Sequence, residues 1–238
     1  MIREHFEIEE TAVTIISERK FIKIAKDAIF EARSQIKLKI SQDPFFKTTY
    51  DPYPASKNDG CVVKRMCDAS KAANVGPMAA VAGAVAEYAV KKMKDAGAKY
   101  AIVDNGGDIA MITDRETFIG LYADVNNERL SLKVPATGRI IGICSSSASI
   151  GPSVSLGRTE ISTVISNNVT LADACATMLG NLIKGSDSME KATEEVCAVD
   201  GVTGCLAYCD GMLAMCGDVP ELVRSDPNDE VITKILLG

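Results

Sequence analysis

The stretch YAIVDNGGDIAMIT, residues 100–113, predicts an antiparallel hairpin and sets the fold class. Its two strand-like runs are separated by an Asn-Gly-Gly turn, Asn105–Gly107. Asn-Gly pairs supply the positive φ angles of a two-residue turn, so the flanking strands run antiparallel. Paired glycines also let a ligand phosphate approach the backbone, and Asp104 and Asp108 place carboxylates on both sides. The hairpin and the phosphate-binding interpretations are compatible.

Strand-like and helix-like patterns alternate on both sides of this hairpin. Further strands are expected at 6–17 (one strand or two), 118–124, 130–134, 139–144 and 161–166. Helices are expected at 17–40 with Ser17 as N-cap, at 59–73, at 76–96 after Gly76-Pro77, at 170–183 and at 187–196. Residues 41–59 read as an irregular segment pinned by aromatics. The run MAAVAGAVA from Met78 is apolar on every side, which predicts a buried helix with other backbone close against it. With no internal repeat, the chain reads as a single α+β domain over residues 1–238.

Composition excludes several function classes. The chain has 238 residues, a net charge of -6 and no basic block, which argues against nucleic acid as a partner. The longest apolar stretch is too short to span a bilayer, and the acidic N-terminus lacks the apolar core of a signal peptide. Eight cysteines without an export signal favour reduced thiols and a cytoplasmic protein. One histidine, His5, leaves little room for histidine catalysis or histidine-rich zinc sites.

A dense run of hydroxyls and glycines follows Cys144, which ends a strand-like segment. Hydroxyls, free amides and Arg158 together suit an anion or a nucleotide phosphate. A thiol facing such a loop would be reactive if electropositive surroundings lowered its pKa. The alternative is a polar surface loop beside a core cysteine. The candidate ligand-binding residues of the two motifs are Asn105, Gly106, Gly107, Asp108, Ser145, Ser146, Ser153, Ser155, Gly157 and Arg158.

The segment LADACATM, beginning at Leu171, supports two interpretations. Asp173 follows Thr170 at the spacing of a helix capping box, which is the purely structural alternative. Asp173 and Thr177 are four residues apart and therefore share one helix face. A carboxylate and a hydroxyl in this arrangement can hold Mg²⁺ at the mouth of a phosphate site. Cys175, on the opposite stripe, reads as a buried small hydrophobe.

The C-terminal run TGCLAYC-DG-MLAMCG predicts a second hairpin, with Cys209 opposite Met212 and Cys205 opposite Cys216. Strand alternation then places Cys205, Cys209 and Cys216 on one face. Three thiols on one face could bind a soft metal or carry sulfur. The favoured alternative is a small-residue core face covered by a helix.

Four stretches together resemble the small ApbE-like family, a relative of the FAD:protein FMN transferases. They are VGPMAAVAGAVAEYAV (75–90), DNGGDIA (104–110), GICSSSASIGPSVSLGRTE (142–160) and LADACATMLGN (171–181). The resemblance implies a T-fold-like domain, with an antiparallel sheet packed against long helices. It also implies that Asp173 and Thr177 hold Mg²⁺ and that FAD or another nucleotide is the ligand. The histidine segment and the Lys-Gly-Tyr segment of the flavin transferases have no counterpart in this chain.

The small family is linked to sulfide assimilation into homocysteine in anaerobes. The first functional hypothesis is therefore an auxiliary factor of sulfur metabolism that works through Cys144, with other sulfur-assimilation proteins as partners. The alternatives are a Mg²⁺-dependent flavin-binding or FMN-transferase-type protein and a non-catalytic flavin- or nucleotide-binding module. Whether the protein is an enzyme stays open, and a homo-oligomer is expected by analogy with T-fold relatives.

Overall fold

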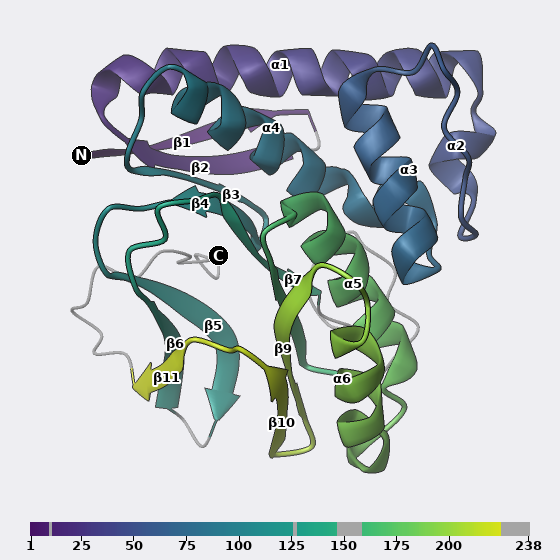
Figure 1. Cartoon of the computed structure of the whole chain (residues 1–238), viewed down its shortest axis with the longest axis vertical. Helices are drawn as coiled ribbons and strands as arrows, with labels where there is room; N and C mark the ends of the chain where they lie inside the picture. Colours follow the sequence, from purple (N-terminus) through teal and green to yellow (C-terminus); the bar gives the residue numbers. More distant parts are fainter. Residues whose placement is uncertain (10, 126–127, 147–158, 225–238) are drawn as a thin grey trace.

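The fold is built on one eight-stranded antiparallel sheet with the strand order β1-β2-β3-β4-β7-β8-β9-β10 (Figure 1). The computed structural model describes residues 1–9, 11–125, 128–146 and 159–224. The strands of this sheet are β1 (Ile2–Ile8), β2 (Thr11–Ser17), β3 (Ala101–Asn105), β4 (Asp108–Ile112), β7 (Ile141–Ser146), β8 (Ile161–Ser166), β9 (Val202–Cys209) and β10 (Met212–Gly217). A second sheet has the order β11-β6-β5 and contains β5 (Thr117–Val125), β6 (Glu128–Val134) and β11 (Glu221–Arg224).

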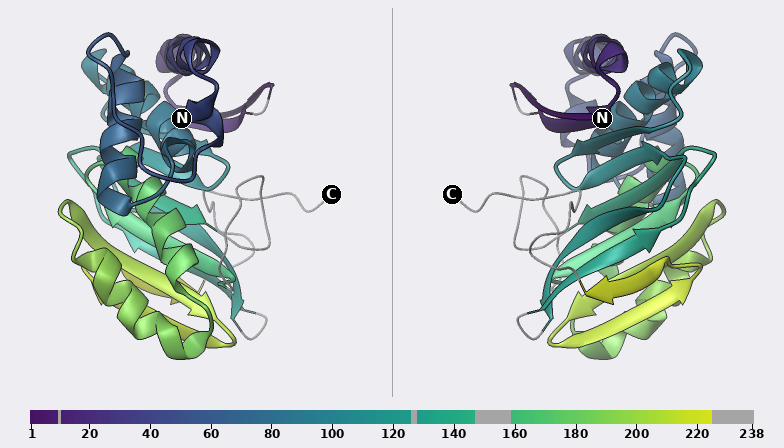
Figure 2. Two further views of the ribbon diagram at one scale, coloured as in Figure 1. Left: turned by 90° about the vertical axis from the view of Figure 1, so that its right-hand side faces the viewer. Right: turned by 90° about the vertical axis from the view of Figure 1, so that its left-hand side faces the viewer.

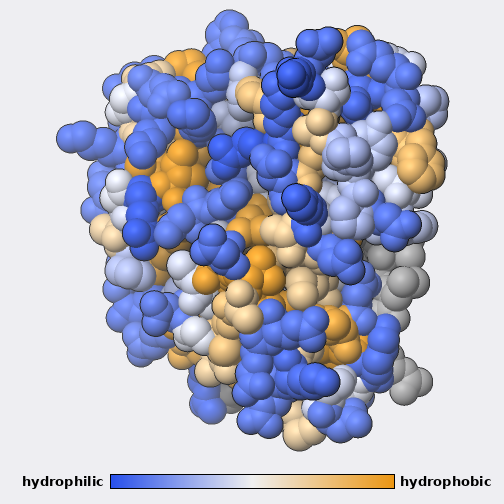
Figure 3. Space-filling view, turned by 45° about the vertical axis from the view of Figure 1, so that its right-hand side comes forward, coloured by the Kyte–Doolittle hydropathy of each residue, from blue (hydrophilic) through white to orange (hydrophobic). Residues whose placement is uncertain are grey.

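Helices cover one face of the large sheet, and the three-stranded sheet packs on the other (Figure 2). The helices are α1 (Arg19–Gln42), α2 (Phe45–Thr48), α3 (Cys61–Ala73), α4 (Val81–Asp95), α5 (Val169–Leu182) and α6 (Met189–Cys197), with short 3₁₀ turns η1 (Pro77–Ala80) and η2 (Ser186–Ser188). The surface view of Figure 3 shows apolar residues across the middle of one side, bordered by hydrophilic ones. No helix in the described ranges is both long and apolar enough to cross a bilayer. The expected α+β class is confirmed.

The predicted central hairpin is present, but its two-residue turn is Gly106-Gly107 and not Asn105-Gly106, because Asn105 is the last residue of β3. Asn105 pairs with Asp108 across the turn. Gly106 and Gly107 have φ angles of 69° and 101°, in the left-handed region that favours glycine. The turn therefore needs both glycines for conformation, and the strands on either side lie in the middle of the large sheet.

The predicted start of the first helix is wrong. Ser17 does not cap α1 but is the last residue of β2, and its hydroxyl donates a 2.7 Å hydrogen bond to the carbonyl oxygen of Tyr100. Because β2 pairs with β3, Ser17 is needed as a sheet residue, and the helix begins at Arg19 with Glu18 as N-cap. The buried stripe of α1 includes Ile22, Ala25, Ile29 and Ile36.

The small residues of α4 allow the close approach that the sequence predicts. A Cβ on Gly83 would lie 2.7 Å from the Cβ of Asp173 and 2.8 Å from the carbonyl oxygen of Val169. A side chain at position 83 would therefore overlap α5. The helix differs from the prediction in one respect, because residues after Gly76 first form the 3₁₀ turn η1 before α4 begins at Val81.

The predicted C-terminal hairpin is confirmed in register. Cys209 pairs with Met212 and Cys205 with Cys216. The face that carries these thiols packs in the same core as α6, which agrees with the favoured core interpretation.

Candidate functional site

Polar side chains gather where β4 begins and β7 ends, beneath the first turns of α4 and α5. Asp108 and Cys144 are direct partners across the β4–β7 pair. Alternation along these strands places both side chains on the helix-bearing face, together with the core residue Ala110. A Cβ on Gly142 would lie 2.7 Å from the Cα of Val169, so glycine at this position lets α5 begin directly over β7.

Asp173 lies in this cluster, and it is only 8% exposed. Its Oδ2 atom accepts a 2.7 Å hydrogen bond from the backbone N–H of Gly83. Burial raises the pKa of Asp173 to about 7, although the backbone hydrogen bonds from Gly83 and Ala82 oppose the shift. Asp173 therefore joins the start of α4 to α5 and carries a proton over part of the neutral range.

Asp108 is the second carboxyl of the cluster. Its Oδ1 atom is inaccessible to solvent and has no hydrogen-bond partner among the described residues. Burial raises the pKa of Asp108 well above its usual value, and the nearby charge of Asp173 raises it further. Among the described residues, the two carboxyls lie together without a positive charge that shifts either pKa, and a bound cation would supply one.

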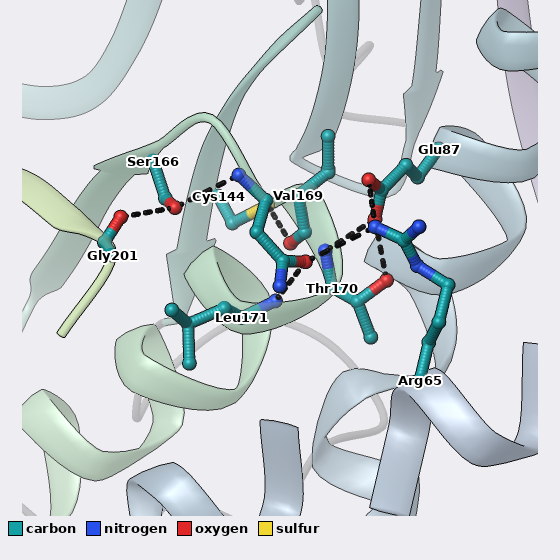
Figure 4. Close-up of polar contacts among 9 residues, drawn as sticks. Arg65, Glu87, Cys144, Ser166, Val169, Thr170, Leu171 and Gly201 are labelled. Atoms are coloured by element: carbon teal, nitrogen blue, oxygen red, sulfur yellow. Dashed lines mark hydrogen bonds and ion pairs between the residues drawn. The ribbon is translucent and has the colours of Figure 1, made fainter. Parts of the chain in front are cut away.

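Cys144 lies beside the two carboxyls and is fully buried. Its thiol donates to the carbonyl oxygen of Val169, with an S···O distance of 3.6 Å (Figure 4). Burial raises the pKa of Cys144 well above its usual value, and the charges of Asp108 and Asp173 add to the shift. The expectation that electropositive surroundings lower this pKa is wrong for the described residues, because the groups that face the thiol are acidic.

The first turn of α5 is held by a buried glutamate rather than by a capping box. Glu87 Oε2 accepts hydrogen bonds from the backbone N–H of Thr170 at 3.0 Å and from its hydroxyl at 2.6 Å, and Arg65 forms an ion pair with Glu87 (Figure 4). The N-cap is Asn168, whose side chain accepts from the N–H of Leu171. The capping-box interpretation of Thr170 and Asp173 is therefore wrong, and the Asp173 carboxyl is directed toward α4 instead.

The turn residues of the motif reach the cluster in different ways. Asn105 donates a 3.1 Å hydrogen bond to the carbonyl oxygen of Ala82, at the start of α4. Asp104 accepts from the N–H of Gly107 at 3.0 Å, which stabilises the turn. A Cβ built on Gly106 would have no atom outside the turn within 4 Å, so the surface of the turn is open.

The predicted serines separate onto two faces of β7. Ser145 pairs with the hydroxyl of Thr163 at 2.8 Å, and alternation directs it away from the carboxyls. Ser146 lies on the same face as Cys144, and its buried hydroxyl has no hydrogen-bond partner among the described residues. Ser146 thus adds a second unpartnered oxygen. Ser153, Ser155, Gly157 and Arg158 lie outside the described residues.

The donor set of the cluster fits a hard cation. Asp108 and Asp173 offer carboxylate oxygens, and Thr177 lies one helical turn after Asp173 with a partly exposed side chain. No group of three His, Cys, Asp or Glu side chains that could hold a metal occurs within the described ranges. A metal at this position would therefore need further oxygen atoms from water or from a ligand phosphate.

A second group of thiols lies under α6, with Cys205 buried and Cys197 and Cys216 half-buried. Cys197 Sγ is 3.6 Å from Cys205 Sγ, and Cys205 donates to the carbonyl oxygen of Thr193 with an S···O distance of 3.4 Å. Burial raises the pKa of Cys197 to about 11. Sequence patterns predict Cys205 and Cys216 in this group but miss Cys197, which comes from the end of α6. Cys175 is buried in the core as predicted.

Comparison with known proteins identifies relatives and a shared fold. The model of a family described as AbpE bacteria matches residues 2–201. The chain is 45% identical over 239 residues to a UPF0280 protein of Archaeoglobus fulgidus, covering 98% of this chain and 100% of that protein. It is 44% identical over 237 residues to a UPF0280 protein of Methanothrix thermoacetophila, again covering 98% and 100%.

Solved structures of flavin transferases share the fold at low sequence identity. Flavin transferase ApbE from Vibrio cholerae superposes with a TM-score of 0.59 at 12% identity, covering 90% of this chain and 96% of that one. The apo form of Pseudomonas stutzeri flavinyl transferase ApbE gives 0.60 at 12%, covering 90% and 94%. The expected ApbE-type fold is confirmed.

Proposed function

The chain belongs to the family described as AbpE bacteria, and from this premise we propose that it binds a flavin nucleotide, FAD, together with Mg²⁺. The fold is that of flavin transferases, whose names give flavin as the group they handle. The site that would bind the nucleotide is the cluster around Asp108 and Asp173, next to the open Asn105–Gly107 turn.

The observation that carries the proposal is the unpartnered, buried oxygen of Asp108 beside a second buried carboxyl, Asp173. Two carboxyls without a nearby cation are costly to ionise together, and the charge of Asp173 raises the pKa of Asp108. Mg²⁺ binds oxygen ligands and commonly combines one or two carboxylates with waters and substrate phosphates. The cluster offers two carboxylates and the Thr177 hydroxyl, which leaves the remaining positions to a diphosphate and water.

Each residue of the site would have a separate role in binding. Asp108 and Asp173 would lose their protons and hold the cation, and the Thr177 hydroxyl would add an oxygen. The cation would neutralise the charge of a diphosphate. Gly106 and Gly107 leave the backbone of the turn accessible to the ligand, because neither carries a Cβ. Gly83 keeps Asp173 in place through its N–H.

The chain offers no histidine at this site. His5, its single histidine, lies on the edge strand β1, where its ring contacts Glu7 at 3.1 Å and Thr14 at 3.4 Å. Because β1 is separated from β4 by β2 and β3, His5 belongs to another part of the sheet. We therefore propose binding as the function. Transfer of FMN to an acceptor is not part of the proposal and is tested by experiment.

Calorimetric titration with FAD tests the proposal. We expect saturable binding in the presence of excess MgCl₂. The affinity for FAD should fall at least about tenfold when EDTA removes the metal, and by a similar factor in Asp173→Asn. Asp200→Asn, which changes an exposed carboxylate in the loop before β9, is the matched control and should bind like the wild type. Equal FAD affinity in wild type and Asp173→Asn, or binding that EDTA does not change, would contradict the proposal. AMP release in the presence of a Thr-bearing acceptor peptide would extend the function from binding to transfer.

Sulfur handling by Cys144 is the second candidate, and one contact favours it. The Cys144 thiol and the Asp108 carboxyl interact directly, so Asp108 is placed to accept the thiol proton. The raised pKa of Cys144 is unfavourable for a thiolate at neutral pH. A strain that lacks the gene, complemented with Cys144→Ser and grown on limiting sulfide, separates the candidates. Loss of sulfide-dependent growth with unchanged FAD affinity would favour the sulfur role.

A further inference from the structure

The two edges of the large sheet are protected differently. The edge strand β1 carries charged side chains at Arg3, Glu4 and Glu7. The opposite edge strand, β10 (MLAMCG), carries none. Charged residues on an edge strand are a common device against unwanted strand pairing. The outer edge of β10 therefore lacks the protection that β1 has.

The apolar side chains of β10 are unusually exposed. Met212 is 52% exposed, Leu213 41% and Met215 53%. Within the described part of the chain, β10 pairs only with β9. A hollow of about 360 Å³ lies between this strand and the start of α6, lined among others by Met189, Glu190 and Thr193. An uncovered edge beside a helix is the arrangement in which PDZ and PTB domains bind an extended peptide.

The hairpin register shows which backbone groups are available. Residues that flank a two-residue turn form a hydrogen-bonded pair, so Met212 and Cys209 are directed toward each other. Alternate residues along an edge strand direct their N–H and C=O groups outward. The outward groups of β10 are therefore those of Leu213 and Met215, and an added strand would pair with them. The carbonyl oxygen of Gly217 already accepts from the N–H of Val219 at 3.2 Å.

Acidic residues surround the hollow. Asp187 in η2 and Glu190 and Glu194 in α6 are exposed and follow one another at intervals of three and four residues, with Lys191 as the one cation between Asp187 and Glu194. Asp210 and Asp218 are exposed immediately beyond the two ends of β10. A second copy paired on this edge would bring acidic groups toward acidic groups, whereas a cationic segment would be attracted.

We propose that β10 and the start of α6 form a docking site for an extended segment of a partner protein, with alternating apolar residues flanked by Lys or Arg. The segment adds a ninth strand to the large sheet beside β10. Its alternating apolar side chains contact Leu213 and Met215 on one face of the sheet, and the side chains between them lie beside Met212 on the other face. Its cationic ends lie near Asp210 and Asp218, just beyond the two ends of β10. Flexible methionines let such a surface adapt to different apolar side chains.

Fluorescence anisotropy with a labelled peptide, Lys-Lys-Val-Thr-Val-Thr-Val-Lys-Lys, tests this site. We expect saturable binding and a loss of at least about tenfold when the lysines are replaced by glutamate. Met215→Pro removes one outward N–H without removing a β9–β10 hydrogen bond, and should weaken binding by at least about tenfold. Met215→Thr keeps that N–H and a strand-favouring side chain, and should retain most of the affinity. Circular dichroism checks that both variants fold.

Three results would overturn the proposal. They are no saturable binding of the lysine peptide, equal affinity for the lysine and glutamate peptides, and equal affinity of the wild type and Met215→Pro. Sedimentation equilibrium tests whether a second copy of the chain occupies this edge instead. A wild-type dimer that Met215→Pro dissociates would assign this edge to a second copy of the chain.

Discussion

The carboxyl cluster at Asp108 and Asp173 and the thiol group under α6 lie against the same face of one sheet, yet they differ in how their polar atoms are satisfied. The thiols of Cys197 and Cys205 contact each other, and Cys205 also donates to a carbonyl oxygen. The Oδ1 atom of Asp108 has no such partner among the described residues. A buried thiol is close to an ordinary small hydrophobe, whereas a buried carboxyl oxygen without a hydrogen bond is costly. A ligand that bonded to the unpartnered oxygen of Asp108 would offset this desolvation cost, so the carboxyl cluster is the better candidate for a binding site.

The largest effect on stability is expected where Gly83 of α4 lies against α5, beneath the carboxyl cluster. Gly83→Ala would place a Cβ 2.7 Å from the Cβ of Asp173 and 2.8 Å from the Val169 carbonyl oxygen. Since both neighbours belong to a packed helix, the free energy of unfolding should fall by about 3 kcal/mol. Urea unfolding followed by circular dichroism measures it. The matched control is Ala198→Gly at the exposed end of α6, which should change stability by less than about 1 kcal/mol. Equal losses of unfolding free energy in Gly83→Ala and Ala198→Gly would show that position 83 is no more tightly packed than the end of α6.

Ionisation of the carboxyl pair should make stability depend on pH. The folded-state pKa of Asp173 is raised to about 7, so the folded protein keeps a proton that the unfolded chain loses near pH 4. The contribution of this group to stability is therefore greatest below about pH 4 and is lost as pH rises through about 7. Asp173→Asn should become more stable relative to the wild type over this window, by about 2 kcal/mol at pH 7.5.

Urea midpoints at pH 4.5, 5.5, 6.5 and 7.5 measure the difference between Asp173→Asn and the wild type. Saturating MgCl₂ should reduce that difference, because a bound cation stabilises the ionised wild type and not the variant. Cys205→Ala changes only the thiol group and should show no such pH dependence below pH 8. A difference between Asp173→Asn and the wild type that is constant across the four pH values would contradict the assignment of the shifted pKa to this site.

The smallest effect is expected at the thiol group itself. Cys205→Ala removes one buried sulfur and should lower the free energy of unfolding by about 1 kcal/mol, with unchanged FAD affinity. Cys144→Ala removes an equally buried sulfur beside the carboxyls. Its stability loss should be similar, but its FAD affinity should change. Titration of both variants with FAD and MgCl₂ compares the regions directly, and a Cys205→Ala variant that loses FAD affinity would overturn the contrast.

Local patterns predict the hairpins because their determinants are adjacent in sequence. The Asn105–Gly107 turn and the Asp210-Gly211 turn each contain the residues that their φ angles require. Strand β11 is missed, because its four residues pair with β6, which is distant in the chain, and no turn signal connects the two. Sequence patterning finds strands joined by short turns more readily than strands that meet through the tertiary fold.

Sequence motifs predict the individual site residues, but they do not predict that these residues lie together in the folded protein. Asp108 and Asp173 stand out in their motifs, but only the packing of α4 on α5 brings Gly83 to Asp173. Glu87 reads as an ordinary polar residue of an amphipathic helix, and its burial against Thr170 has no local signal. The pKa of Cys144 could not be predicted from its own loop either, because its acidic neighbours come from β4 and α5.

The pairing of β2 with β3 has a consequence for how the protein is made. Ser17 pairs with Ala101, so all of residues 18–100, including α1, α3 and α4, lie between two neighbouring strands. Closing a loop of this length costs roughly 4 kcal/mol of chain entropy. During synthesis the β1–β2 ribbon emerges long before its partner strand, and it cannot complete its sheet until β3 has left the ribosome. The N-terminal ribbon therefore waits for its native neighbour until all of residues 18–100 have been made.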